Sequence, residues 1–151
     1  MQQLMKEALR FFGMNAPSQS LRIAMYRKGG IRIGNVHAFG NGIWLDINYI
    51  KNLITIEDDV HLAGHTQILS HSYLLHGYKE EGISPVIIRK GARVGFNVLI
   101  LAGVTIGENS IIGAGSVVTN DIPPNCLAVG VPAKPIRFLN KRLVGEHKNV
   151  S

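Results

Sequence analysis

Residues 88–123 read IRKGARVGFNVLILAGVTIGENSIIGAGSVVTNDIP, and every sixth position of this stretch is aliphatic. A period of six fits neither an α-helix, which repeats every 3.6 residues, nor a half-buried strand, which repeats every two. It is typical of a triangular coil in which short strands alternate with sharp corners. The sequence therefore predicts a parallel β-helix whose inward positions are Ile88, Val94, Ile100, Ile106, Ile112 and Val118.

The same phase recurs earlier in the chain. Small or β-branched residues follow each inward aliphatic four places on, as Val98 and Ser116 do, and are expected to pack beneath the corners. A first coil has Ile33, Phe39 and Leu45 in phase, and a second has Ile56, Leu62 and Ile68. The phase is lost after Tyr73 until Ile88, which predicts a loop over 74–87. We thus expect an all-β fold of about four coils, with a helical cap at 1–30, the β-helix at 31–124 and a closing segment with a basic tail at 125–151, in one domain overall.

Two short helices are expected before the first coil. Residues 2–13 carry apolar residues on one face, and Gly13 is expected to end that helix. A second helix over 21–28 is expected to begin at a cap on Ser18 or Ser20 and to end at the glycine pair that follows. Such helices are suited to covering the unpaired backbone at the open end of a β-helix.

Composition narrows the class of partner and the compartment. The chain has 151 residues, a net charge of +6 and a single cysteine, Cys126. The charge is explained either by an anionic partner, such as a cofactor phosphate, or by solvated basic residues near the C-terminus. No nucleic-acid-binding motif is present, so no nucleic-acid partner is expected. The first fifteen residues lack a signal-peptide core, which predicts a cytoplasmic location, and a membrane-surface association of the first helix stays open.

The segments VTIGENSIIGAGSVVTNDIPPN (104–125) and AVGVPAK (128–134) resemble the end of a hexapeptide-repeat acyltransferase. The resemblance covers roughly residues 21–138 and is strongest to the sugar O-acetyltransferase branch, with its galactoside, maltose, capsule- and lipopolysaccharide-modifying members. It implies a left-handed coil and a homotrimer with active sites between subunits. It also implies acetyl-CoA as the donor and a hydroxyl of a sugar or polysaccharide precursor as the acceptor.

His71 lies in the segment ILSHSY (68–73), which resembles the aliphatic strand that carries the general base in that family. An alcohol is a poor nucleophile at neutral pH, and an imidazole can take its proton as the oxygen attacks the thioester. Ser72 stands where relatives often have Asp, so no orienting carboxylate is evident. A backbone carbonyl is therefore expected to hold the second ring nitrogen.

Further site residues follow from coil stacking and from the resemblance. Asp46 and Asn48 lie one coil below His71 and are candidates for holding the acceptor, although both also suit a solvated corner. Two more acceptor candidates are Tyr73, which directly precedes the loop, and His76 within it. The family places coenzyme A along coils three and four, which implies that the donor contacts are Gly95, Ala114, Thr119 and Asn120, with the phosphates near Lys134 and Arg137.

Two other classes of function stay open. His71 and His76 are five residues apart, as are two metal ligands of the γ-class carbonic anhydrases, a sister family on the same coil. The third ligand is lacking, because Asn48 stands beneath His71, so no metal is expected. The other alternative is a non-catalytic β-helix that serves as an assembly module. The sequence names neither the acceptor nor the choice between O- and N-acetylation.

Overall fold

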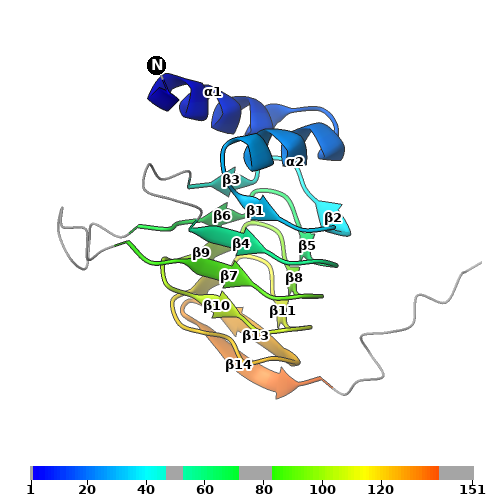
Figure 1. Ribbon diagram of the computed structural model, residues 1–151. Coiled ribbons are helices and arrows are strands. Elements are labelled where there is room, and N and C mark those ends of the chain that lie inside the picture. Colours follow the sequence, from blue (N-terminus) through cyan, green and yellow to red (C-terminus); the bar gives the residue numbers. More distant parts are fainter. Residues whose placement is uncertain (1, 47–52, 72–82, 140–151) are drawn as a thin grey trace, which may run out of the picture.

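The computed structural model describes residues 2–46, 53–71 and 83–139 and forms a three-sided prism of short strands with two helices across one end (Figure 1). Sheet A contains β1 (Arg32–Ile33), β4 (Ile54–Ile56), β7 (Val86–Ile88) and β10 (Thr105–Ile106). Sheet B contains β2 (Ala38–Phe39), β5 (His61–Leu62), β8 (Arg93–Val94), β11 (Ile111–Ile112), β13 (Cys126–Gly130) and β14 (Ala133–Phe138). Sheet C contains β3 (Trp44–Leu45), β6 (Gln67–Ile68), β9 (Leu99–Ile100) and β12 (Val117–Val118).

The predicted phase is confirmed through all four coils. On sheet C, Leu45 pairs with Ile68, Ile68 with Ile100, and Ile100 with Val118, so that inward residues stack in columns. Each of the twelve in-phase residues is buried, Ile33 being the most exposed at 7%. Full burial of one such side chain stabilises a fold by roughly 1.5–3 kcal/mol, so these columns form the core of the protein.

The corners use residues that tolerate a left-handed backbone. Positive φ angles occur at glycines and at five other residues, four of them Asn or Asp, whose short polar side chains adopt this region more readily than most. The five are Asp59, His65, Asn97, Asn109 and Asn125. The repeating Gly, Asn and Asp positions therefore turn the chain from one sheet to the next.

The helices cover the first coil as expected, with one correction. α1 (Gln2–Asn15) continues past Gly13, which does not end it. A Cβ on Gly13 would lie 3.2 Å from the ring of Tyr26, so this glycine serves the close approach of the helices. α2 (Gln19–Lys28) begins at Ser18, whose Oγ accepts from the Leu21 N–H at 3.2 Å, and this predicted cap is confirmed. Tyr26 anchors α2 by donating its hydroxyl to the Ile43 carbonyl at 2.5 Å.

The outer face of α1 is apolar. Leu4, Met5, Phe11 and Phe12 are each more than half exposed. These residues are the feature on which a membrane-surface association would depend. No helix in the described part of the chain is long and apolar enough to cross a bilayer.

The residues on either side of segment 72–82 meet at an edge of the prism. His71 forms an antiparallel bridge with Ile83, and the Ser84 N–H donates to the Ser70 carbonyl at 3.0 Å. β7 begins at Val86, so the chain rejoins the coil before the predicted loop boundary at 87. The structural reason is the pairing of Val86 with Ile54 of β4, which extends the sheet A ladder.

The C-terminal segment closes the last coil. β13 pairs in parallel with β11 and antiparallel with β14, and a cis Val131–Pro132 bond joins β13 to β14. The predicted closing segment is therefore a hairpin added to sheet B.

Candidate functional site

His71 lies at the corner between sheets C and A, three residues beyond the end of β6. Its side chain is 26% exposed, so one part of the ring contacts solvent while another contacts protein. An antiparallel bridge to Ile83 holds the backbone of His71 in place. This position allows an outside molecule to reach the imidazole.

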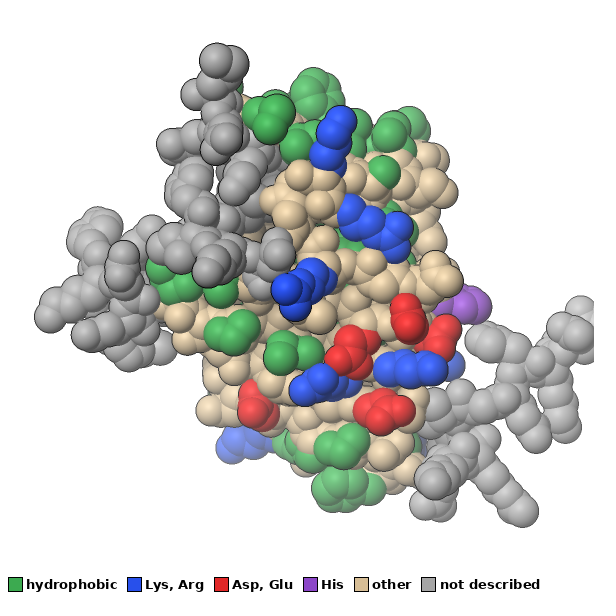
Figure 2. Space-filling view, in the orientation of Figure 1, with side chains coloured by type: hydrophobic (Ala, Val, Ile, Leu, Met, Phe, Trp, Pro, Cys, Tyr) green, Lys and Arg blue, Asp and Glu red, His purple; other side chains and the backbone are tan. Residues whose placement is uncertain are grey.

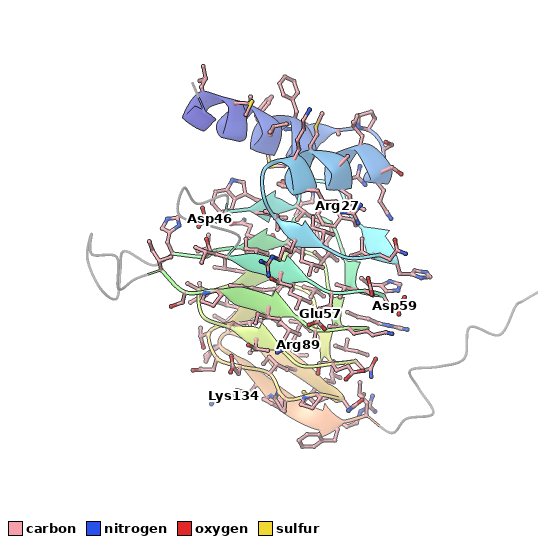
Figure 3. The ribbon with its side chains drawn as sticks, viewed as in Figure 1. Arg27, Asp46, Glu57, Asp59, Arg89 and Lys134 are labelled. Atoms are coloured by element: carbon pink, nitrogen blue, oxygen red, sulfur yellow. The ribbon has the colours of Figure 1, made fainter. Side chains whose placement is uncertain are left out.

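Asp46 (labelled in Figure 3) contacts His71 through its side chain. Its side chain is 6% exposed, and its Oδ2 contacts Nδ1 of His71. The same oxygen accepts from the Ser70 N–H at 3.1 Å and from the Ser70 hydroxyl at 2.8 Å. Because a carboxylate only accepts, this contact puts the proton of neutral His71 on Nδ1 and leaves the basic lone pair of the ring on Nε2.

This contact corrects one expectation from the sequence. An orienting carboxylate exists, and it comes from the coil below rather than from position 72. The predicted proximity of Asp46 to His71 is confirmed, but the buried carboxylate faces the histidine and Ser70. The sequence signal for this arrangement was the stacking of Asp46 one coil beneath the strand that carries His71.

Three other predicted site residues lie outside the described part of the chain, namely Asn48, Tyr73 and His76. Their roles stay predictions. Among residues 2–46, 53–71 and 83–139, no three His, Cys, Asp or Glu side chains are placed to hold one metal ion. The other histidines of this part lie on different surfaces: His37 stacks on His61 at 4.3 Å, and His65 meets the Phe96 ring edge-on at 5.0 Å.

The predicted donor residues fall on two corners of the prism. Gly95 and Ala114 lie together at the corner between sheets B and C, in adjacent coils. A Cβ on Gly95 would lie only 2.6 Å from the Ala114 nitrogen, so the glycine is required for this stacking. Thr119 and Asn120 lie at the next corner, between sheets C and A, where the Asn120 amide donates to the Thr119 hydroxyl at 2.9 Å.

The two predicted phosphate-binding cations lie on β14. Lys134 and Arg137 are both exposed, and neither makes an ion pair with any residue in the described ranges. Figure 3 places Lys134 toward the end of the prism opposite α1, away from Asp46. Within one chain, the histidine and these cations are thus separated along the prism axis.

The face over sheet A carries mixed charge (Figure 2). Arg89 pairs with Glu57 at 2.8 Å, and Lys90 pairs with Asp59 at 3.7 Å. A hollow of about 680 Å³ beside the first pair is lined by both of its members and by Asp121 among others. Its lining in the described part of the chain contains none of the predicted site residues.

Comparison with known proteins agrees with the geometry. The family model described as bacterial transferase hexapeptide (six repeats) matches residues 85–120. The galactoside O-acetyltransferase of Escherichia coli K12 is 36% identical over 118 residues, which are 70% of this chain and 58% of that protein. The matched part spans 53% and 58% of two curated relatives and 41% of a third.

Two solved structures extend the likeness to nearly the whole chain. A hexapeptide-repeat-containing acetyltransferase from Vibrio cholerae, complexed with acetyl coenzyme A, has a TM-score of 0.73 and 28% identity over 92% of this chain and 87% of that one. A maltose O-acetyltransferase from Clostridium difficile 630 has a TM-score of 0.65 and 30% identity over 93% and 87%. The predicted left-handed parallel β-helix is confirmed by these neighbours.

Proposed function

Because the chain belongs to the hexapeptide-repeat acyltransferase family, we propose that it transfers the acetyl group of acetyl-CoA to a hydroxyl of a sugar. The acetyl-CoA complex of the Vibrio cholerae structure supports the donor. The names of the galactoside and maltose O-acetyltransferases support a sugar acceptor. The same names favour acyl transfer over the metalloenzyme and assembly-module alternatives.

The contact between Asp46 and His71 is the observation that carries the proposal. Nε2 of His71 takes the proton of the acceptor hydroxyl as its oxygen attacks the thioester carbonyl. The tetrahedral intermediate then collapses, the carbon–sulfur bond breaks, and the imidazolium returns its proton to the coenzyme A sulfur. Asp46 orients the ring and stabilises the imidazolium that forms in between. It is a positioning residue in this scheme, because its Oδ2 contacts His71 and Ser70.

The donor is assigned to the predicted contacts. Small residues at Gly95 and Ala114 allow the pantetheine arm to approach the backbone, and Thr119 and Asn120 offer polar groups at the next corner. Lys134 and Arg137 supply positive charge for the phosphates. This assignment also accounts for part of the net charge of +6.

We assign the site to the boundary between copies in a homotrimer. Gly95 and Thr119 lie on the two different corners of the prism that bound sheet C. In a closed ring of three, each heterologous interface brings one corner of a copy beside a different edge of the next. A groove between copies can therefore combine both sets of contacts. The cytoplasmic location stays a prediction, to be tested by cell fractionation.

The test is release of free thiol from acetyl-CoA in the presence of a panel of neutral sugars, followed by mass detection of the acetylated product. We expect His71→Ala to bind acetyl-CoA as the wild type does and to lose roughly 10²- to 10⁴-fold in turnover. The proposal would be refuted by wild-type turnover in that variant, or by a wild type that neither binds acetyl-CoA nor releases thiol.

A further inference from the structure

A hollow of about 390 Å³ lies on the outer face of sheet C, near the end of α1. Trp44 of β3 and Gln67 of β6 are paired neighbours in its floor. Both point outward, because the residues that follow them in each strand are fully buried and side chains alternate along a strand. Met14 closes one end, where its carbonyl accepts the Gly42 N–H at 3.3 Å. We call this feature the Trp44 hollow.

The rim of the Trp44 hollow is held by backbone geometry. Gly42 has φ +66°, and a Cβ there would lie 2.8 Å from the ring of His65. The His65 ring therefore lies over this glycine, and the Phe96 ring packs against it at 5.0 Å. Asn97, with φ 55°, brings its amide to the same rim. Because corners set these positions, the rim is organised before any ligand arrives.

The lining combines an aromatic plane with neutral hydrogen-bonding groups. The side-chain amides of Gln67 and Asn97 make no hydrogen bond within the described part of the chain. Each amide both donates and accepts, which matches a hydroxyl. Within the same described residues, the lining contains no Lys, Arg, Asp or Glu. A pyranose ring presents C–H groups on its faces, suited to an indole, and hydroxyls at its edge, suited to amides.

The Trp44 hollow leads to the proposed base. Leu69 belongs to its lining, and His71 follows two residues later, beyond a bend at Ser70. On the coil below, Asp46 likewise follows Trp44 by two residues. A ring seated on the indole therefore has its edge toward the corner that carries the Asp46–His71 contact.

We infer that the Trp44 hollow is the subsite for an uncharged pyranose ring of the acceptor, with Trp44 as its platform and Gln67 and Asn97 as its hydroxyl partners. The inference rests on the proposed acetyl transfer for its role in catalysis, and it names the residues and the charge class of the sugar. We expect neutral sugars to bind in preference to anionic ones such as uronic acids, because the described lining offers no cation.

Trp44 is the single tryptophan of the chain, so its fluorescence reports on the hollow directly. We expect saturable changes on titration with maltose or methyl β-galactopyranoside, and none with sorbitol or glucuronate at equal concentration. Identical responses to sugar and sorbitol, or no response to any neutral pyranoside, would overturn the subsite. This titration needs no turnover, so it decides the subsite even if acetyl transfer is not observed.

Kinetic variants separate the subsite from the proposed function. Trp44→Leu keeps an apolar floor without the aromatic face, and we expect kcat/KM for the sugar to fall about tenfold with KM for acetyl-CoA unchanged. Gln67→Ala and Asn97→Gly each remove one amide, the second while keeping the left-handed backbone, and we expect a loss of about fivefold each. Asn109→Gly is the matched control, because it removes an amide from a left-handed corner outside the hollow.

Normal sugar kinetics in Trp44→Leu, with sugar acetylation intact in the wild type, would overturn the subsite and leave the proposed function standing. A wild type without acetyl-CoA-dependent thiol release would overturn the proposed function, whatever the fluorescence shows.

Discussion

Substitution of Asp46 by Asn isolates the charge of the orienting group. The Asn Oδ1 can occupy the place of Oδ2 and accept from Ser70 N–H, Ser70 Oγ and His71 Nδ1 as the carboxylate does. The ring orientation and tautomer are thereby kept. A hydrogen bond between neutral groups is worth about 0.5–1.5 kcal/mol, and one to a charged group about 1.5–3 kcal/mol. The imidazolium of the transition state therefore loses about 1–2 kcal/mol, and kcat should fall roughly 5- to 30-fold.

The assay is steady-state thiol release with both substrates varied. We expect KM for acetyl-CoA to stay unchanged, since Asp46 acts through its contacts with His71 and Ser70, and an effect confined to kcat marks an interaction made in the transition state. Asp58→Asn is the control, because Asp58 also accepts a backbone N–H, that of Asn35 at 2.7 Å, but at a corner distant from His71. Wild-type kcat in Asp46→Asn, or an equal loss in Asp58→Asn, would refute the reasoning.

Three further predictions concern the core, the cysteine and the cations. Ile100→Ala should lower the free energy of unfolding in urea by about 2–5 kcal/mol, because the side chain is fully buried, whereas half-buried Leu99→Ala should cost clearly less. Burial raises the pKa of the Cys126 thiol, against an opposing hydrogen bond from Ser110, so alkylation by iodoacetamide at neutral pH should be slow until the protein unfolds; fast labelling of folded protein would contradict this. Lys134→Gln with Arg137→Gln should raise the Kd of acetyl-CoA roughly fivefold or more, and added salt should shrink the difference; equal affinities at low salt would argue against phosphate contacts there.

The fold could be predicted because its periodicity is local. One inward aliphatic every six residues specifies where strands and corners alternate, and the phase needs no knowledge of distant contacts. The errors occurred where a tertiary contact overrides a local signal. Gly13 looked like a helix end, but it allows Tyr26 to approach α1. Val86 was assigned to the loop, but it pairs with Ile54 of the coil below.

The site was predicted less completely, because its groups come from different coils. His71 could be chosen from its segment, and stacking brought Asp46 near it. The role of the carboxylate depends on which way two side chains turn at one corner, and a period of six does not specify that. The Trp44 hollow was missed for the same reason: Trp44, His65 and Asn97 are spread over three coils and become neighbours only when the coils stack.

The candidate site lies where the coils depart from their regular length of 18 residues. On sheet C, stacked residues are 18 positions apart between Ile100 and Val118, which is one regular coil, but 23 apart between Leu45 and Ile68 and 32 apart between Ile68 and Ile100. Both additions come in the sequence where the chain passes from sheet C to sheet A, one after Asp46 and the other after His71. A regular coil of 18 residues needs neither addition. Insertions between the strands of a rigid scaffold often carry function. The length irregularities and the carboxylate–histidine contact thus point independently to the same corner as the centre of the chemistry.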